Sequence, residues 1–366
     1  MSGFIVGAYA AAPGELDLDP RAEDEWYRHL RAIPGVGGLE LAWTGTLHPR
    51  GVERLAEVLD PAWGSVVTCI PGTGRTLATD PVFGLASDNT DGRRRAIDDL
   101  ARVHAEVRRL QHERGDAAVL AVEIHSAPHS FEARSSTESF AASLSEVAAW
   151  PWGSARLMVE HCDAVVPAVS GRARLRAQKG FLSLADEIAA VAAANAAISA
   201  MQASTQTAAP ASATSALRPA IGHALNWARS AIETRSVDGP AAHLAAMVSA
   251  GTPTAVMFSG VSPVETEYGK AFLDAHLPVA APANGWARAA GHGPVTAAEN
   301  DRRSGLEPTS LLTGDIVQST LALAGPTGFA YVGVKVGASR TRLTHLDRLA
   351  PTLATLAALE HAALTG

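Results

Sequence analysis

Eight short apolar runs, separated by helical patterns, constrain the fold of this chain more than any other feature of its sequence. The runs span residues 4–10, 38–44, 64–70, 117–125, 155–161, 219–227, 253–259 and 328–336. Each run has the length of a strand, and a helical pattern or a capping signal follows it. Strands that alternate with helices form parallel sheets, and eight of them can close into a barrel. We therefore predict an α/β protein with one (β/α)8 TIM-barrel domain over residues 1–366.

The helical segments have their own signals. Residues 93–111 carry one apolar stripe, formed by Ile97, Leu100, Val103, Val107 and Leu110. Ser135 with Glu138 fits a capping box, and Ser183 is placed to cap a helix that starts with acidic residues. The last predicted helix, about residues 341–364, repeats Leu343, Leu346, Leu349, Leu353 and Leu356. This helix would close the outer ring.

Two connections interrupt the alternation. Residues 202–217 are of low complexity and predict a mobile surface connection. Residues 260–314 form a long insertion between the seventh and eighth runs, as in a lid, a binding loop or a disordered segment. A doubly wound open sheet is the main alternative fold, but the first run lacks its glycine-rich nucleotide loop. Residues 71–75 (PGTGR) fit a turn better than a phosphate loop.

Charge and cysteine content exclude several classes of protein. The chain has 37 acidic and 30 basic residues, a net charge of -7, and no basic stripe of the kind that binds nucleic acid. Its two cysteines, Cys69 and Cys162, cannot build a disulfide framework. The N-terminus lacks the pattern of a signal peptide, and no stretch reaches the roughly 18 apolar residues of a membrane span. We expect a cytoplasmic protein with a small-molecule substrate and no nucleic-acid or membrane partner. By analogy with other barrels, a homodimer or homotetramer is possible.

Polar side chains gather where the apolar runs end, and in TIM barrels the catalytic groups lie at those strand ends. We assign acid–base and charge-stabilising roles to Glu123, His125, Glu160, His161 and Lys335. We assign substrate binding to Glu40, Asn226, Trp227, Arg229, Ser230 and Ser259. For Trp227, packing in the core is the alternative to stacking on a sugar. A buried thiol is the favoured interpretation of Cys162.

The alternation of side chains along a strand tests which of these groups point into the barrel. With Glu123 inward, Val119, Ala121 and His125 also point inward. Glu40 and Glu160 fit the interior in the same way, whereas His161 faces away unless its strand has already ended. Three carboxylates in one barrel mouth need a compensating proton, metal ion or basic side chain. Lys335 and Arg229 could supply that charge, or a divalent cation could.

Five segments carry a resemblance to a known family: EIHSAP (123–128), VEHCDA (159–164), KGFLSLADEI (179–188), LNWARSAIE (225–233) and MFSG (257–260). They resemble a bacterial family catalogued as domain of unknown function 4862, which implies no activity. More remotely, the layout is similar to the xylose isomerase-like barrels, which include sugar isomerases and epimerases and bind a divalent metal through Glu, Asp, His and Glu. In that resemblance Glu160 matches the first ligand. Asn226, Ser259 and Lys335 stand near the other three, which should weaken a metal site.

Three hypotheses follow. The first is a sugar or sugar-acid isomerase, epimerase or lyase without a predicted cofactor, in which Glu123 or Glu160 is the base and His125 or His161 the proton donor. Lys335 and Arg229 would stabilise the oxyanion. The second keeps a divalent metal, held by Glu123, His125, Glu160 and His161. The third is a barrel that binds a sugar without turning it over.

Overall fold

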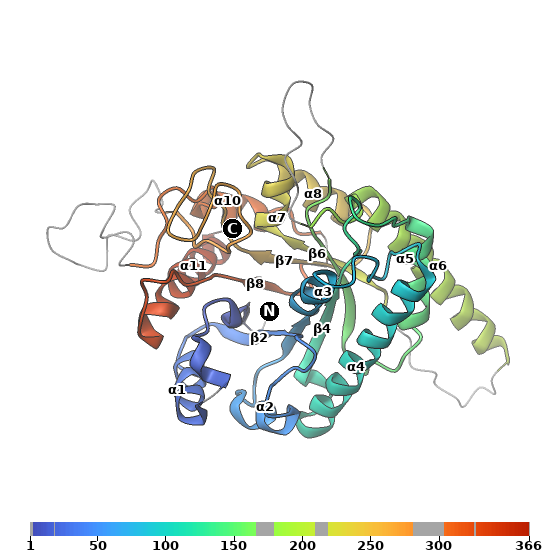
Figure 1. The fold of residues 1–366 in the computed structure, drawn as a ribbon, viewed down its shortest axis with the longest axis horizontal. Helices are drawn as coiled ribbons and strands as arrows, with labels where there is room; N and C mark the ends of the chain where they lie inside the picture. Colours follow the sequence, from blue (N-terminus) through green and yellow to red (C-terminus); the bar gives the residue numbers. More distant parts are fainter. Residues whose placement is uncertain are drawn as a thin grey trace, which may run out of the picture.

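The computed structural model confirms the predicted barrel (Figure 1). It describes residues 3–17, 19–165, 179–208, 219–280, 304–325 and 327–365. Eight parallel strands pair in sequence order and close on themselves. They are β1 (Phe4–Val6), β2 (Val36–Ala42), β3 (Ser65–Thr68), β4 (Val119–Ile124), β5 (Arg156–His161), β6 (Gly222–Asn226), β7 (Thr254–Phe258) and β8 (Val332–Val334). Each lies within or beside one of the eight apolar runs.

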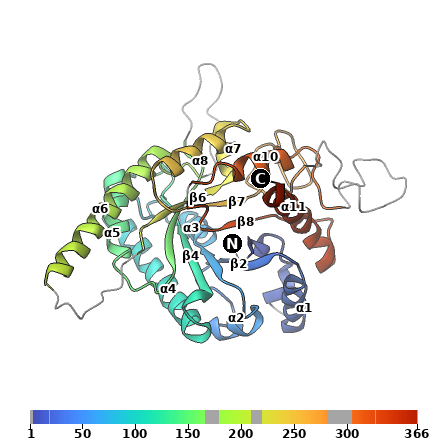
Figure 2. The ribbon, with the colours of Figure 1, turned by 180° about the vertical axis from the view of Figure 1, so that it is seen from behind.

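Helices surround the strands in both ribbon views (Figures 1 and 2). They are α1 (Pro20–Arg31), α2 (Val52–Val58), α3 (Ile70–Leu77), α4 (Thr90–Arg114), α5 (Thr137–Val147), α6 (Leu184–Ala208), α7 (Trp227–Thr234), α8 (Gly239–Ser249), α10 (Gly314–Leu321) and α11 (His345–Thr365). The short helix α3 directly follows β3 and lies in front of the strands in Figure 1. That figure therefore views the barrel from the carboxyl ends of its strands.

The side chains of the strands pack in two layers, one inside the barrel and one between the strands and the helices. Inside the barrel, Ala121, Met158, Ala224 and Met257 belong to a small buried cluster. The larger core lies between the strands and the helices, where the predicted stripe of α4 is buried. Val119 packs in this outer core and not inside, which corrects its predicted orientation. The pairing of β3 with β4 is irregular at Ser65, so the alternation from Glu123 does not extend back to Val119.

The helix signals are partly confirmed. Ser183 caps α6: its Oγ accepts from the backbone N–H of Asp186 at 3.2 Å. The cap of α5 is Ser136 and not Ser135, because the Ser136 Oγ receives the Ser139 N–H. Residues 71–75 lie within α3 and form no turn. In the leucine repeat, Leu349 and Leu356 are buried, whereas Leu343, Leu346 and Leu353 are exposed.

Helix α6 corrects the expectation about membrane spans. Within the described residues, Leu184–Ala203 is long and apolar enough to cross a membrane by length and composition, with a mean hydropathy of 1.3. Alanine supplies much of this apolarity, and one face is buried against the barrel through Ala190, Val191, Ala194 and Ile198. The helix lies beside α5 in both ribbon views (Figures 1 and 2). Of this window 33% is buried, so we interpret α6 as an outer helix that packs one face on the barrel.

The two interrupting connections are described only in part. Residues 202–208 continue α6, and 209–218 lie outside the described residues. Of the long insertion, residues 281–303 lie outside them as well. The described first part folds back on β7 through backbone hydrogen bonds between Gly260 and Leu277 in both directions. It then meets the end of β8, where the Gly337 N–H donates to the His276 carbonyl at 2.7 Å.

Candidate active site

Lys335 forms a buried ion pair with Glu40 at the carboxyl end of the barrel. Lys335 follows β8 directly, Glu40 lies on β2, and the Lys335 Nζ is 2.5 Å from Glu40 Oε1. The same Nζ is 3.6 Å from Glu160 Oε1 on β5. Gly7, after β1, makes room for this contact, because a Cβ there would lie 2.5 Å from Glu40 Oε2 and 3.0 Å from Lys335 Cγ. All of these groups are buried.

Four donor groups of the site surround the Glu160 carboxylate. His125 Nε2 donates to Glu160 Oε2 at 2.6 Å, and the Arg229 guanidinium lies 2.9 Å from the same oxygen. Asn226 Nδ2 donates to Oε1 at 3.1 Å. Together with Lys335, these contacts surround both oxygens of one buried carboxylate with donors. The Arg229 side chain continues to Asp274, whose Oδ2 accepts from Nε at 3.1 Å.

Glu123 lies next to Glu40 and takes a different partner. Its Oε1 accepts the hydroxyl of Tyr331 at 2.7 Å, while Oε2 has no hydrogen-bond partner in the described part of the chain. Each of Glu40, Glu123 and Glu160 places an oxygen within 4.8 Å of the others. At this distance inside a protein, carboxylates repel each other strongly, so their protonation is linked.

The environment divides the three carboxyl groups into two kinds. Burial raises the pKa of Glu123 well above its usual range, and the charges of Glu160 and Glu40 add to this. Burial also raises the pKa of Glu40 despite Lys335. Burial opposes the charge of Glu160 as well, but Arg229 and Lys335 hold the pKa of that carboxyl well below its usual range. Glu160 is therefore the fixed anion, and Glu40 with Glu123 are the groups able to hold a proton.

The basic groups divide in the same way. Burial opposes the charge of Lys335, yet Glu160 and Glu40 raise its pKa well above the usual value, so it stays an ammonium. Burial lowers the pKa of His125 despite its hydrogen bond to Glu160. His125 is therefore neutral at neutral pH, and its Nδ1 has no hydrogen-bond partner in the described part of the chain. The site thus combines two permanent cations, Lys335 and Arg229, with the neutral imidazole of His125.

A divalent metal does not fit the four positions that the remote resemblance singles out. The structure brings them together, since Ser259 Oγ donates to Asn226 Oδ1 at 3.1 Å and Asn226 contacts Glu160. Only Glu160 offers a carboxylate, and the Asn226 amide turns its NH2 group toward it. The three-carboxylate group of Glu40, Glu123 and Glu160 has the spacing of a metal site. However, the Lys335 ammonium lies against two of these carboxylates, and its charge would repel a cation.

Three of the predicted site residues lie outside the cluster around Glu160: His161, Trp227 and Ser230. His161 faces the helices, where its ring nitrogens contact Glu187 and Glu233. It therefore does not share one site with Glu123, His125 and Glu160. Ser230 contacts His243 on α8, and Trp227 is buried in the outer core. Cys162 is a buried thiol whose pKa burial raises well above its usual value, and it accepts a hydrogen bond from Arg229.

Sequence reasoning missed two contacts of the site. Tyr331 could have been found, because alternation places it on the same face of its strand as Gly333 and Lys335. Asp274 had no such signal, since it lies in the long insertion, where no periodicity fixes a direction. Asp274 is buried, and the charge of Arg229 lowers its pKa although burial opposes this. His276, in the same insertion, is partly buried, and its Nδ1 lies 3.5 Å from Asp274 Oδ1.

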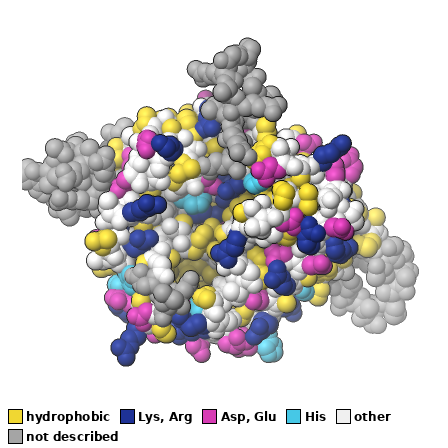
Figure 3. Space-filling view, in the orientation of Figure 1, with side chains coloured by type: hydrophobic (Ala, Val, Ile, Leu, Met, Phe, Trp, Pro, Cys, Tyr) yellow, Lys and Arg dark blue, Asp and Glu magenta, His cyan; other side chains and the backbone are white. Residues whose placement is uncertain are grey.

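The face that carries the strand ends is hollowed near its middle, with side chains of both charges around the hollow (Figure 3).

A family model for the domain of unknown function DUF4862 matches residues 5–350. The chain belongs to this family. The sequence-based resemblance is thereby confirmed.

Known proteins extend this comparison. The DUF4862 chain is 30% identical over 337 residues to an uncharacterized protein of Salmonella typhimurium, which covers 92% of this chain and 89% of that protein. The fold of the DUF4862 chain is similar to that of a D-psicose 3-epimerase of Clostridium cellulolyticum solved with D-tagatose. The TM-score is 0.50, the identity is 12%, and the match covers 100% of this chain and 99% of the epimerase. A sugar phosphate isomerase/epimerase of Parabacteroides distasonis gives a TM-score of 0.46, 9% identity, and 98% and 94% coverage. The likeness to the D-psicose 3-epimerase concerns the fold alone, the closed eight-stranded TIM barrel.

Proposed function

We propose that this protein is a cytoplasmic enzyme that isomerises, epimerises or cleaves a sugar or sugar acid beside its carbonyl group. The observation that carries the proposal is the contact of Lys335 with Glu40 and Glu160 at the strand ends, with Arg229 on the other oxygen of Glu160. Two fixed cations stand there beside carboxyls with raised pKa. This combination suits a reaction in which a proton leaves carbon and negative charge develops on oxygen.

Each residue then has a distinct task. Glu40, which shares protons with Glu123, takes the proton from the carbon beside the carbonyl, so that a C–H bond breaks and a carboxylic acid forms. The negative charge on the resulting enediolate oxygen is stabilised by the Lys335 ammonium. In an isomerase Glu40 returns the proton to the neighbouring carbon. In an epimerase Glu40 keeps that proton, and protonated Glu123 donates its own to the opposite face of the same carbon. Neutral His125 acts as acceptor and donor of the proton at oxygen. Glu160 positions these groups, because its low pKa makes it a poor base.

The fold supports the substrate class only in general terms. The similar structures are named for D-psicose 3-epimerase and for sugar phosphate isomerase/epimerase activity. For this chain, Arg229 and Lys335 favour a substrate with an anionic substituent. The network suits acid–base chemistry better than the displaced metal set, because His161 lies on the other face of β5.

The test is deuterium incorporation from D2O into the α-carbon of a panel of carbonyl sugars and sugar acids, followed by NMR. We expect incorporation with at least one member of the panel, and a 10²–10⁴-fold lower rate in Glu40→Gln, the range of acid–base catalysis. Leu144→Ala is the control for stability: Leu144 is buried in α5, away from the site, and its loss weakens the fold without touching these groups. Tight sugar binding without incorporation, unchanged in Glu160→Gln, would instead support a binding barrel.

A further inference from the structure

A second cluster of titratable side chains lies on the outside of the barrel, between β5, α7 and α8. His161 ends β5, and its Nε2 is 3.0 Å from Glu233 Oε2 on α7. The Nε2 of His243 on α8 is 3.9 Å from Glu233 Oε1. The two imidazole rings lie edge to face, with centroids 5.1 Å apart. Two imidazoles thus face the two oxygens of one carboxylate.

The other nitrogen of each ring is held by an outer partner. His161 Nδ1 contacts Glu187 Oε2 at 2.6 Å, and Glu187 is fixed in turn by the hydroxyl of Ser126. His243 Nδ1 contacts Ser230 Oγ at 3.0 Å. Histidines that bind metals almost always use one ring nitrogen for the metal and the other for such a partner. Here both rings are oriented with Nε2 toward Glu233.

We propose that His161, Glu233 and His243 bind a zinc ion. Each offers one ligand atom, and these atoms lie within 4.8 Å of one another. Bonds of about 2 Å around a tetrahedral ion place ligand atoms ~3.3 Å apart, so small side-chain shifts complete the site. Three protein ligands leave the fourth position for water. Glu233 and His243 each keep 15% of their side-chain surface exposed, which gives the ion a route in.

The charges of the cluster favour a divalent cation. Two carboxylates, Glu187 and Glu233, contact His161, and Glu233 also faces His243. The Glu233 carboxylate also accepts the Ala164 N–H at 2.8 Å, which ties α7 to the segment after β5. A zinc ion would join β5, α7 and α8 beside the segment that carries Glu160 and Cys162. The proposal stands independently of the proposed function.

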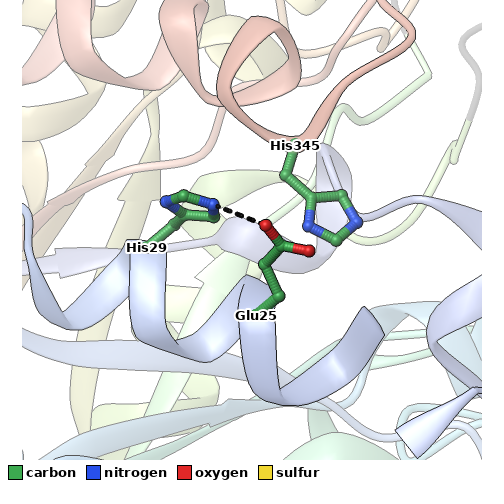
Figure 4. Close-up of side chains that lie close together, drawn as sticks. All are labelled: Glu25, His29 and His345. Carbon is green, nitrogen blue, oxygen red and sulfur yellow. Dashed lines mark ion pairs between the residues drawn. The ribbon is translucent and has the colours of Figure 1, made fainter. Parts of the chain in front are cut away.

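A group of the same residue types on the surface serves as a comparison for the His161 cluster. Glu25 on α1 places its carboxylate between the imidazole rings of His29 and His345 (Figure 4). Here the Glu25 side chain is 53% exposed, and His345 Nδ1 has no hydrogen-bond partner in the described part of the chain. This group has the ligand types of the His161 cluster, but among the described residues no outer partner holds Nδ1 of His345. We expect the His161 cluster to bind zinc more tightly.

The experiment uses the untagged full chain, stripped with a chelator, dialysed against ZnCl2 and analysed for metal. We expect one zinc per chain that is retained in His29→Ala/His345→Ala and lost in His243→Gln. Ser230→Ala, which removes only the outer partner of His243, should weaken zinc affinity about tenfold. Cobalt in place of zinc should give visible absorption of a tetrahedral site in wild type and none in His243→Gln.

Two results would overturn the proposal. The first is that wild type retains no zinc above the level of His243→Gln, and the second is that zinc retention depends on His29 and His345 alone. Folding of each variant is checked by thermal unfolding without metal. Zinc should raise the melting temperature of wild type but not that of His243→Gln, so a destabilised variant and a variant without a site give different results.

Discussion

Lys335 is the residue on which the charge balance of the barrel depends. Its ammonium faces Glu40 and Glu160 in a buried space, so neither carboxylate has bulk water to stabilise its charge. Removing one partner of a buried ion pair leaves an uncompensated charge, whereas removing both is often well tolerated. The stability of the chain should therefore show strong coupling between Lys335 and Glu40.

Lys335→Met should lower the free energy of unfolding by about 3–5 kcal/mol, because it leaves Glu40 buried without its cation and Glu160 with Arg229 alone. The double variant Lys335→Met/Glu40→Gln should recover a large part of that loss. Urea unfolding of the two single variants and the double variant measures the coupling. Additive effects of the two substitutions would show that the ion pair has no special role.

Gly7→Ala tests the packing of the same pair. The new Cβ would lie 2.5 Å from Glu40 Oε2, so the carboxylate must move away from Lys335. We expect deuterium exchange into substrate to fall at least tenfold with the fold retained. Gly74→Ala is the matched control, because Gly74 lies in α3 with no atom within 4 Å of an added Cβ. Equal exchange rates in the two variants would argue against a role of Glu40 in the reaction.

His223 on β6 makes the fold sensitive to acid. Burial, with a smaller effect of His161, lowers the pKa of His223 to about 4, and neither ring nitrogen has a hydrogen-bond partner in the described part of the chain. The neutral ring contributes its full stability above the unfolded pKa of about 6.5, and that stability is lost as pH falls toward 4. The lost contribution approaches about 3 kcal/mol. His223→Leu should flatten the fall in melting temperature between pH 6.5 and 4; an unchanged slope would contradict this assignment.

Among the elements, ion pairs of Asp274 hold the described part of the long insertion against the mouth of the barrel. Asp274 contacts both Arg229 and, at 3.7 Å, Lys179, and Gly260 pairs with Leu277. These contacts lie over the ends of β7 and β8, so the segment 259–280 connects the site to the rest of the insertion. Its order should depend on Asp274 more than on its exposed ion pairs.

Asp274→Asn should raise amide hydrogen-exchange rates in residues 270–280 by about tenfold or more, because a buried ion pair with Arg229 is lost. Glu265→Gln is the control, since Glu265 forms an exposed pair with Lys270. Exposed pairs contribute little to stability, so that variant should exchange like wild type. Equal exchange in the Asp274 and Glu265 variants would show that Asp274 does not hold the segment.

For the whole molecule, the sequence predicts the barrel and much of the site, for identifiable reasons. Apolar runs set the eight strands, and alternation correctly places Glu40, Glu123 and Glu160 on the inner face. The cap at Ser136 and the helix at residues 71–75 are decided by local geometry that composition leaves open. Asp274 comes from a segment without periodicity. The partners of His161 come from three helices that begin well after β5, with Glu187 26 residues and Glu233 72 residues along the chain, so no local pattern predicts these contacts.

We propose that Lys335 and Arg229 supply in the barrel mouth the positive charge that a metal ion would otherwise supply. This claim is tested most directly by the rate of deuterium incorporation into the α-carbon of a carbonyl sugar in the presence of a chelator, for wild type and Lys335→Met. We predict that incorporation persists with the chelator and falls about 10²–10³-fold in Lys335→Met. Incorporation that the chelator abolishes and Mn²⁺ restores, or a folded wild type that exchanges no sugar in the panel, would contradict the claim.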